Sequence, residues 1–272
     1  MTDDLAHLMT IAQQAVGLGY DLVKNTTPSE IRLKGDRDVV TEVDLRIEHE
    51  VRTYLDHAAP DFGFLGEEQG STVDPATAEY LWTLDPIDGT SNFAHGLPLC
   101  AISLALLHHG DPIVAAIVAP QLDLRYYAAK DRGAFGNDGQ LQVSKTTDLS
   151  HAIVSIGDYA VGPNAKEKNE VRLRLTALLA ERVERIRMFG TAALDLAWVA
   201  EGRTDATIIL SNKPWDTAAG VLLAREAGAA VLDGDGAAHR ITSTETVVAC
   251  PEIVSALLSL LQAIPEGSGY ER

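Results

Sequence analysis

The most constraining feature of this sequence is a strand followed at once by an acidic turn at residues 82–93, which read WTLDPIDGTSNF. The apolar start predicts a short strand that ends in Asp85 and Asp88, with a proline of fixed φ between them. Gly89 and Thr90 follow where a helix can begin, and unpaired N–H groups at such a point can hold an anion. Two carboxylates beside an anion site indicate divalent-metal chemistry on a phosphate. An ordinary turn is the alternative interpretation, because Asp and Gly both favour turns.

Three further segments place acidic residues at the end of a predicted strand or the start of a predicted helix. Glu67 and Glu68 follow an apolar, strand-like piece, and strand ends of open α/β sheets gather where such sheets bind ligands. Asp44 opens a helix with regularly spaced apolar residues, but it also fits a capping box with Thr41. Asp216 opens another helix and can equally serve as its N-cap.

These segments occur in the order and approximate spacing of a known family. The chain resembles the inositol monophosphatase family from about residue 5 to residue 260, through the sequences VVTEVD, GEE, DPIDGTSNF and WDTAAG. The resemblance implies a mixed α/β fold arranged as a layered α-β-α-β-α sandwich. It also implies a magnesium-dependent, lithium-sensitive phosphatase of sugar-like and nucleotide phosphates that forms a homodimer.

The resemblance further implies two or three Mg²⁺ ions per subunit. Glu67, Asp85 and the carbonyl of Ile87 would hold the first ion, and Glu67 would also reach a third, mostly water-bound ion. Asp85, Asp88 and Asp216 would hold the second ion, so that Asp85 bridges two ions and Asp88 faces the phosphate. Carboxylates suit magnesium, and none of these motifs contains the His or Cys that zinc prefers.

The remaining roles that the resemblance implies concern the attacking water and the phosphate. Asp44 and Thr90 would orient the water on the first ion, so they count with Glu67 as catalytic residues. Gly89 and Thr90 would present backbone N–H groups to the phosphate. Glu68 would lie next to the metal-binding residues without binding an ion itself, and Lys34 would lie on a mobile entrance loop.

The substrate side departs from the family pattern. Gly190, Thr191 and Ala192 resemble the segment that approaches the alcohol portion of the substrate, although Thr191 also fits a helix N-cap. Inositol-specific members carry a hydroxyl-binding glutamate where this chain has Ile209, which cannot accept a hydrogen bond. One of the polar residues at 211–213 can take its place. The sequence therefore argues against strict inositol specificity.

Composition excludes several classes of function. The 39 acidic and 22 basic residues give a net charge of −17, which argues against binding to nucleic acid or an anionic membrane. No apolar run reaches the length of a membrane span, and the N-terminus lacks the form of a secretory signal. We expect Cys100 and Cys250 to be buried thiols, in keeping with a cytoplasmic protein. His108 and His109 fit a solvated hairpin turn better than a catalytic site.

The apolar pattern predicts alternating helices and strands within one domain spanning residues 1–272. We expect two merged lobes, a metal and phosphate lobe at 1–145 and a substrate lobe at 146–264, followed by a flexible tail at 265–272. Helices are expected at 5–22, 47–58, 168–182, 191–201, 216–227 and 252–262, and strands at 81–84, 100–107, 113–118, 124–129, 153–156, 205–210, 229–232 and 246–249.

Three classes of function remain open at this point. The leading hypothesis is a phosphomonoesterase that hydrolyses a small polyol or sugar phosphate with a metal-activated water. Histidinol phosphate, fructose 1,6-bisphosphate and adenosine 3′,5′-bisphosphate are alternative substrates within the same fold. The other classes are a regulatory protein that keeps the fold but acts through a partner, and a metal-binding protein without catalysis.

Overall fold

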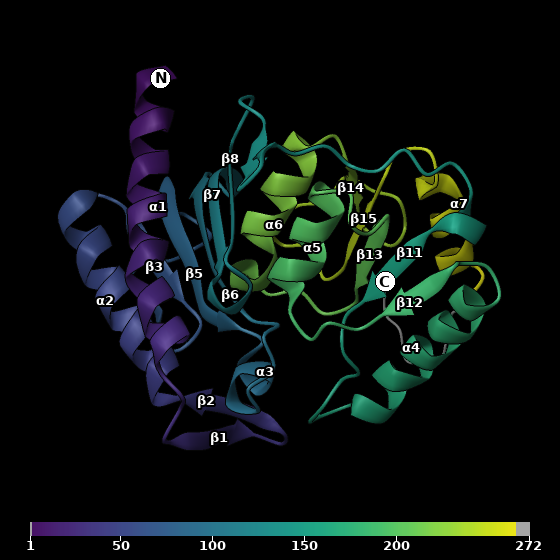
Figure 1. Cartoon of the computed structure of the whole chain (residues 1–272), viewed down its shortest axis with the longest axis horizontal. Coiled ribbons are helices and arrows are strands. Elements are labelled where there is room, and N and C mark those ends of the chain that lie inside the picture. The colour runs from purple at the N-terminus through teal and green to yellow at the C-terminus, as the bar shows by residue number, and fades with distance from the viewer. Residues whose placement is uncertain (1, 265–272) are drawn as a thin grey trace.

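Five layers of helix and sheet make up the structure, a computed structural model that describes residues 2–264. Figure 1 shows α1 and α2 outside one sheet, α5 and α6 between that sheet and a second one, and α4 and α7 outside the second sheet. The mixed α/β, α-β-α-β-α sandwich expected from the sequence is therefore confirmed. The tail expected at 265–272 lies outside the described residues.

The large sheet contains eight strands in the order β10-β9-β8-β7-β6-β5-β3-β4. Its strands are β3 (Gly63–Gly66), β4 (Gly70–Ser71), β5 (Tyr80–Asp88), β6 (Ala101–His108), β7 (Asp111–Ala119), β8 (Leu124–Ala129), β9 (Ala134–Gly136) and β10 (Gly139–Gln140). All neighbours are antiparallel except β3 and β5. The central strands β6 and β7 are almost continuously apolar because helices cover both of their faces.

The second sheet has the order β12-β11-β13-β15-β14, and a separate hairpin pairs β1 with β2. These strands are β1 (Ile31–Gly35), β2 (Asp38–Thr41), β11 (Ile153–Ile156), β12 (Arg185–Arg187), β13 (Ala206–Ile209), β14 (Ala230–Leu232) and β15 (Thr246–Ala249). The helices are α1 (Thr2–Asn25), α2 (Glu42–Ala58), α3 (Thr90–Ala94), α4 (Ala165–Ala180), α5 (Ala192–Ala200), α6 (Pro214–Glu226) and α7 (Val254–Gln262), with 3₁₀ turns at Pro120–Leu122 and Leu149–His151.

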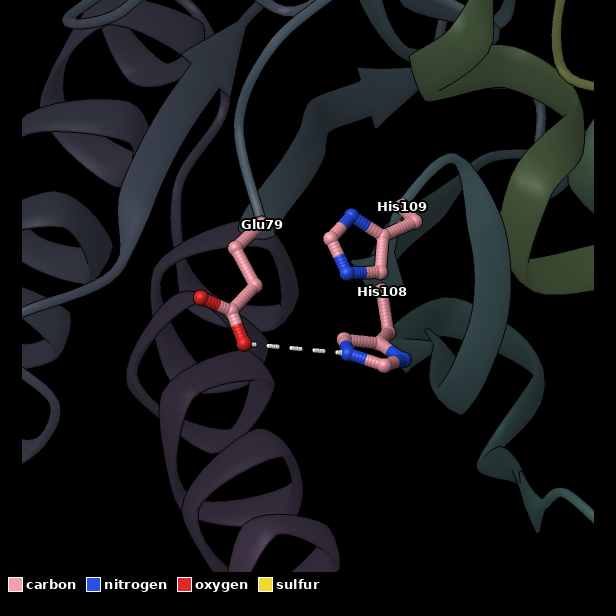
Figure 2. Close-up of side chains that lie close together, drawn as sticks. All are labelled: Glu79, His108 and His109. Atoms are coloured by element: carbon pink, nitrogen blue, oxygen red, sulfur yellow. Dashed lines mark ion pairs between the residues drawn. The ribbon is translucent and has the colours of Figure 1, made fainter.

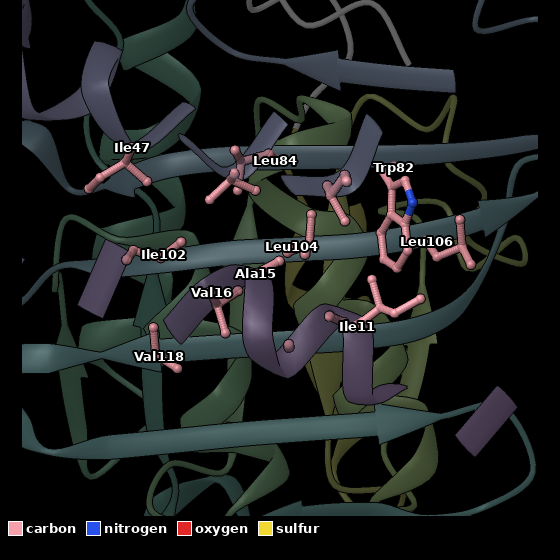
Figure 3. Close-up of a cluster of buried hydrophobic side chains, with 14 of the residues drawn as sticks. Ile11, Ala15, Val16, Ile47, Trp82, Leu84, Ile102, Leu104, Leu106 and Val118 are labelled. Carbon is pink, nitrogen blue, oxygen red and sulfur yellow. The ribbon is translucent and has the colours of Figure 1, made fainter. Parts of the chain in front are cut away.

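Separate apolar clusters fill the spaces between the layers. Figure 3 shows the cluster between the outer helices and the large sheet, to which α1 contributes Ile11, α2 contributes Ile47, and the sheet contributes Trp82 and Leu104. Burying one such large side chain contributes about 1.5–3 kcal/mol to folding. Other clusters join the large sheet to α5 and α6, these helices to the second sheet, and that sheet to α4 and α7. The layers thereby hold the strand ends that carry the acidic residues in place.

The strand that carries the main motif is longer than the sequence predicts. β5 includes both Asp85 and Asp88, whereas the predicted range stops at residue 84, and its pairing with β6 shifts register between these two residues. Such an irregularity re-aims side chains at the end of a strand. The apolar run that predicts the strand stops at Leu84, and Asp and Pro at the next two positions are residue types that are depleted in strands.

Two further expectations need correction. Lys34 lies in strand β1 of a hairpin, not in a loop, because β1 pairs with β2 over Ile31–Thr41. Helix α6 begins at Pro214 with Lys213 as its N-cap, so Asp216 stands in the first turn and is not the cap. Proline is well suited to this first helical position. The other predicted helices and strands are confirmed, with ends that differ by a few residues.

The predicted capping box and buried cysteines are also confirmed. Thr41 accepts hydrogen bonds from Val43 and Asp44, and the Asp44 carboxylate accepts one from the Thr41 backbone at 2.9 Å. Cys100 and Cys250 are both buried free thiols. Among residues 2–264, no helix combines the length and the apolar character needed to cross a membrane.

Candidate active site

The end of β5 forms a tight backbone turn at the centre of the site. Asp85 accepts a hydrogen bond from the backbone N–H of Ile87 at 3.0 Å, and α3 then begins after Gly89. Gly89 has φ +88°, and a side chain there would come within 2.8 Å of the Leu99 carbonyl oxygen. This position therefore requires glycine, because both the left-handed backbone and the close carbonyl exclude a Cβ.

Four carboxylates from three parts of the chain gather around this turn. Burial raises the pKa of Asp85 well above its ordinary value, and the negative charges of Glu67, Asp88 and Asp216 raise it further. Burial likewise raises the pKa of Asp216, with Asp88 and Glu67 contributing. At 4 Å two such charges repel by about 4 kcal/mol at an effective dielectric constant near 20. An oxygen-rich, buried and strongly anionic cluster is the environment that a hard divalent cation suits.

Lys34 supplies a positive charge at the edge of this cluster. Its ammonium group lies 2.7 Å from Glu67 and 2.8 Å from Glu68. Although burial lowers the pKa of Lys34, the hydrogen bonds to both glutamates raise it above its ordinary value. The hairpin thus places the positively charged side chain of Lys34 directly next to Glu67. One ammonium group does not balance the charges of the acidic cluster.

A glutamate that the sequence analysis missed supports the turn at Glu67 and Glu68. Glu48 in α2 is fully buried, and its carboxylate accepts backbone N–H groups from Glu68 at 2.9 Å and Gln69 at 2.7 Å. A Cβ on Gly66 would lie 2.4 Å from this carboxylate. Burial raises the pKa of Glu48. The sequence signal that could have indicated this role is the spacing of Glu48 from Asp44, which is one helical turn and places both residues on the same face of α2.

Asp44 and Thr90 form a hydrogen-bonded pair on the other side of the cluster. The Thr90 hydroxyl lies 3.1 Å from one Asp44 oxygen and 2.9 Å from the carbonyl oxygen of Ile87. The second Asp44 oxygen accepts from Thr41. Asp44 is almost fully buried, and burial raises its pKa. The capping box and the contact with Thr90 therefore coexist in one carboxylate.

Asp88 is tied to the start of α5. One of its carboxylate oxygens accepts from the Thr191 hydroxyl at 2.7 Å and from the Ala193 backbone at 2.5 Å. Thr191 is also the N-cap of α5, as the sequence predicts. Burial raises the pKa of Asp88 to about 6, although these hydrogen bonds oppose the rise. These hydrogen bonds join the acidic cluster to the start of α5.

A pocket extends from the acidic cluster toward the second sheet. It has a volume of about 190 Å³ and is lined by Asp88, Gly157, Asp158, Arg172, Gly190, Thr191, Ala192, Asp195, Ile209, Leu210, Ser211 and Asp216. All three predicted substrate residues, at 190–192, line it, and so does Ile209. Of the suggested substitutes for the missing glutamate, Ser211 lines the pocket, whereas Asn212 donates to the carbonyl of Ser243 at 3.0 Å.

The pocket also contains polar residues that the sequence analysis missed. Asp158 is exposed, although partial desolvation raises the pKa of its carboxylate, which has no partner among the described residues. Asp195 is fully buried, and its Oδ1 atom also lacks a hydrogen-bond partner within the part of the chain that the structure describes. Arg172 donates to the carbonyls of Asp158 and Leu210, both at 3.2 Å. Asp158 follows a strand end, which was its only sequence signal.

Phosphatases of the layered α/β type are the class of protein that this fold and this acidic pocket define. The family model described as "Inositol monophosphatase family" matches residues 4–266. The chain belongs to the inositol monophosphatase family, whose members hydrolyse phosphoric monoesters, and it is a phosphatase of this family.

Both relatives and solved structures agree with this assignment. The chain is 38% identical to an inositol-1-monophosphatase of Rhizobium meliloti over 86% of each protein. It is 35% identical to the Nus factor SuhB of Xylella fastidiosa, covering 88% of this chain and 86% of that protein. The crystal structure of extragenic suppressor protein suhB from Bartonella henselae superposes with a TM-score of 0.87 at 32% identity, covering 94% of this chain and 98% of that one.

Proposed function

We propose that this chain is a Mg²⁺-dependent phosphomonoesterase of a small polyol or sugar phosphate. The observation that carries the proposal is the cluster of Glu67, Asp85, Asp88 and Asp216, in which Asp85 and Asp88 are buried. The donor set consists of hard carboxylate oxygens together with the Ile87 carbonyl, which fits Mg²⁺ better than a softer metal. We assign Glu67, Asp85 and Ile87 to one ion and Asp85, Asp88 and Asp216 to another, and Glu67 to a third.

Bound Mg²⁺ would neutralise these carboxylates, activate a water and stabilise negative charge on the phosphate. The chain's own residues orient the reactants. Asp44, held by Thr41 and Thr90, accepts a hydrogen bond from the attacking water and takes up its proton. Gly89 and Thr90 present backbone N–H groups to the phosphate from the turn after β5. Lys34 and Glu68 keep Glu67 oriented through their ion pair.

A substrate panel tests the proposed function. The purified chain with Mg²⁺ should release phosphate from inositol 1-phosphate or another polyol phosphate, and EDTA should abolish the activity. Histidinol phosphate, fructose 1,6-bisphosphate and adenosine 3′,5′-bisphosphate belong in the same panel as alternative substrates. Absence of turnover of every member in the presence of Mg²⁺ would contradict the proposal. Inhibition by Li⁺, expected from the family resemblance, can be measured in the same assay.

On the alcohol side, we propose Asp158 as the group that binds substrate hydroxyls in place of the missing glutamate. A Cβ on Gly190 would lie 3.3 Å from the Asp158 carboxylate, so this carboxylate stands beside the segment that approaches the alcohol. Ile209 lines the same pocket, close to Gly157, but offers only an apolar side chain. The unpaired Asp158 carboxylate lines the pocket and can accept hydrogen bonds from two hydroxyls.

Asp158→Ala should raise KM for the polyol phosphate about tenfold or more, because a hydrogen bond to a charged group contributes about 1.5–3 kcal/mol. The value of kcat should change little, since Asp158 is not assigned to the reacting phosphate. para-Nitrophenyl phosphate, which lacks hydroxyls, serves as the matched substrate and should keep its KM in the variant. Equal losses with both substrates would show that Asp158 acts on the structure of the pocket instead.

The pKa shifts predict how Mg²⁺ binding depends on pH. Because the pKa of Asp88 in the folded protein, about 6, exceeds its ordinary value, the folded state holds more protons than the unfolded state between these values. The unfolding free energy of the metal-free protein should therefore fall as pH rises from about 4 to about 6. The pKa values of Asp85 and Asp216 are raised as well, so these two residues act in the same direction.

Mg²⁺ should replace these protons, so it should raise Tm more at pH 7.5 than at pH 5. Thermal unfolding with Mg²⁺ and with EDTA at the two pH values measures this difference. A larger rise in Tm at pH 5 would contradict the assignment of these acids as metal ligands.

A regulatory role is the second candidate, since one relative carries the name Nus factor SuhB. The complete set of acids and the net charge of −17 favour catalysis over nucleic-acid contact. A cellular phenotype that survives in a catalytically inactive variant would favour the regulatory role.

We further propose that residues 1–272 act as one domain with the two lobes described above, as a cytoplasmic homodimer.

A further inference from the structure

A second group of metal-binding side chains lies at the opposite end of β5 from Asp88. Glu79 directly precedes β5, His108 ends β6, and His109 begins the two-residue turn that leads to β7. Figure 2 shows the carboxylate and the two imidazole rings facing one common space. One potential ligand atom from each residue lies within 4.8 Å of the other two. The acidic pocket and its proposed mechanism use none of these three residues.

We infer that Glu79, His108 and His109 bind a divalent transition-metal ion, with Zn²⁺ as the best match. Two imidazoles and one carboxylate are a ligand set that zinc accepts, whereas Mg²⁺ prefers oxygen ligands alone. The site would leave one position of a tetrahedral ion for water. The bound ion would cross-link the segment before β5 to the β6–β7 turn and so stabilise this end of the large sheet.

The backbone at His109 brings the two neighbouring histidines to the same side. Successive side chains of a strand point to opposite faces, so adjacent histidines normally diverge. His109 has φ +51° and Gly110 has φ +82°, and positive φ at both central residues is typical of a two-residue hairpin turn. A non-glycine residue with positive φ is uncommon and costs free energy. The conformation that is costly for the chain is the one that makes the two imidazoles converge.

Other contacts hold the remaining ligands near this position. The His108 ring stacks on Tyr80, with ring centres 4.6 Å apart, and Tyr80 stacks on Phe62 at the same distance. The backbone N–H of His109 donates to the Glu79 carbonyl at 2.8 Å. The segment before β5 is therefore already joined to the turn by its backbone. The imidazole of His108 has little freedom to turn away.

Small side-chain rotations complete the coordination shell. The Glu79 carboxylate and His108 Nε2 lie 4.0 Å apart, and the two histidine ring centres lie 4.4 Å apart. Ligands bound at about 2.1 Å to a tetrahedral ion are about 3.4 Å from each other. The Glu79 side chain is two-thirds exposed, so it can move by this amount without displacing packed neighbours. The three ligands can therefore close around an ion while the backbone stays fixed.

Calorimetric titration of the full chain with ZnCl₂ tests this site. The acidic pocket can also bind Zn²⁺, so the experiment uses protein that carries Asp85→Asn and an excess of Mg²⁺. We expect one Zn²⁺ per chain, and at least about tenfold weaker binding after His108→Ala or His109→Asn. Asparagine is suited to the same turn because it tolerates positive φ, so His109→Asn removes the ligand and keeps the backbone.

His151→Ala is the matched control, because His151 is exposed and lies in a different part of the chain. This control should bind Zn²⁺ as tightly as its parent. Thermal unfolding gives a second measurement, in which Zn²⁺ should raise Tm of the parent and the control but not of the His108 and His109 variants. Unchanged Zn²⁺ binding in both of these variants, or no saturable binding in the parent, would overturn the inference. Phosphatase activity is not needed for either measurement.

Discussion

Asp85→Asn should lower kcat/KM of the phosphatase reaction by about 10³-fold or more, with Mg²⁺ present at the concentration that saturates the unsubstituted enzyme. We assign this carboxylate to two ions at once, so its loss weakens both. Metal ions contribute several kcal/mol to charge stabilisation in such reactions, and about 4 kcal/mol corresponds to a thousandfold change in rate. Steady-state phosphate release with a polyol phosphate measures the effect.

The same substitution should leave the metal-free protein at least as stable as its parent. Asp85 is buried among three other carboxylates, so a neutral side chain of equal size removes both repulsion and the cost of burying a charge. Its Tm should respond less to Mg²⁺ than that of the unsubstituted protein. Asp61→Asn, at an exposed position outside the site, is the matched control and should change neither property. An Asp85→Asn enzyme that keeps full activity would contradict the metal assignment.

Local sequence signals predicted those parts of the site that depend on neighbouring residues. The turn after β5 follows from a proline and a glycine beside Asp85 and Asp88. The Thr41–Asp44 capping box follows from the spacing of two residues about one helical turn apart, and the Thr191 N-cap follows from a threonine just before a predicted helix. Each of these features is fixed by short-range hydrogen bonds, and the structure reproduces each of them.

Features that depend on contacts between distant segments were not predictable in the same way. Glu48 appears in the sequence as one more acidic residue of an amphipathic helix, yet it is buried against the turn at Glu68. Asp158 and Arg172 meet only because two strand ends of the second sheet lie beside α4. Lys34 reaches Glu67 only through a hairpin whose residues are mostly exposed and carry little apolar pattern. Tertiary packing, not local spacing, decides all of these positions.

Thr90→Val should lower kcat by about 10²-fold or more while leaving KM nearly unchanged. The Thr90 hydroxyl joins the Asp44 carboxylate to the Ile87 carbonyl, at 3.1 and 2.9 Å. Valine has nearly the same shape but lacks the hydroxyl, so it removes these hydrogen bonds without opening a cavity. A misplaced general base loses much of the 10²- to 10⁴-fold that such catalysis contributes. Initial-rate measurements over a range of substrate concentrations separate kcat from KM.

Thr90→Ser is the matched control for this prediction, because serine keeps the hydroxyl and should retain kcat within a fewfold. Asp44→Asn should reproduce the loss seen with valine, since an amide accepts a hydrogen bond but cannot take up the proton of the attacking water. Thr41→Ala separates this effect from stability: losing the cap should cost about 1 kcal/mol of unfolding free energy with a smaller fall in kcat. If Thr90→Val and Thr90→Ser were equally active, the hydroxyl would have no part in orienting the water. Asp44 would then belong to the helix cap alone.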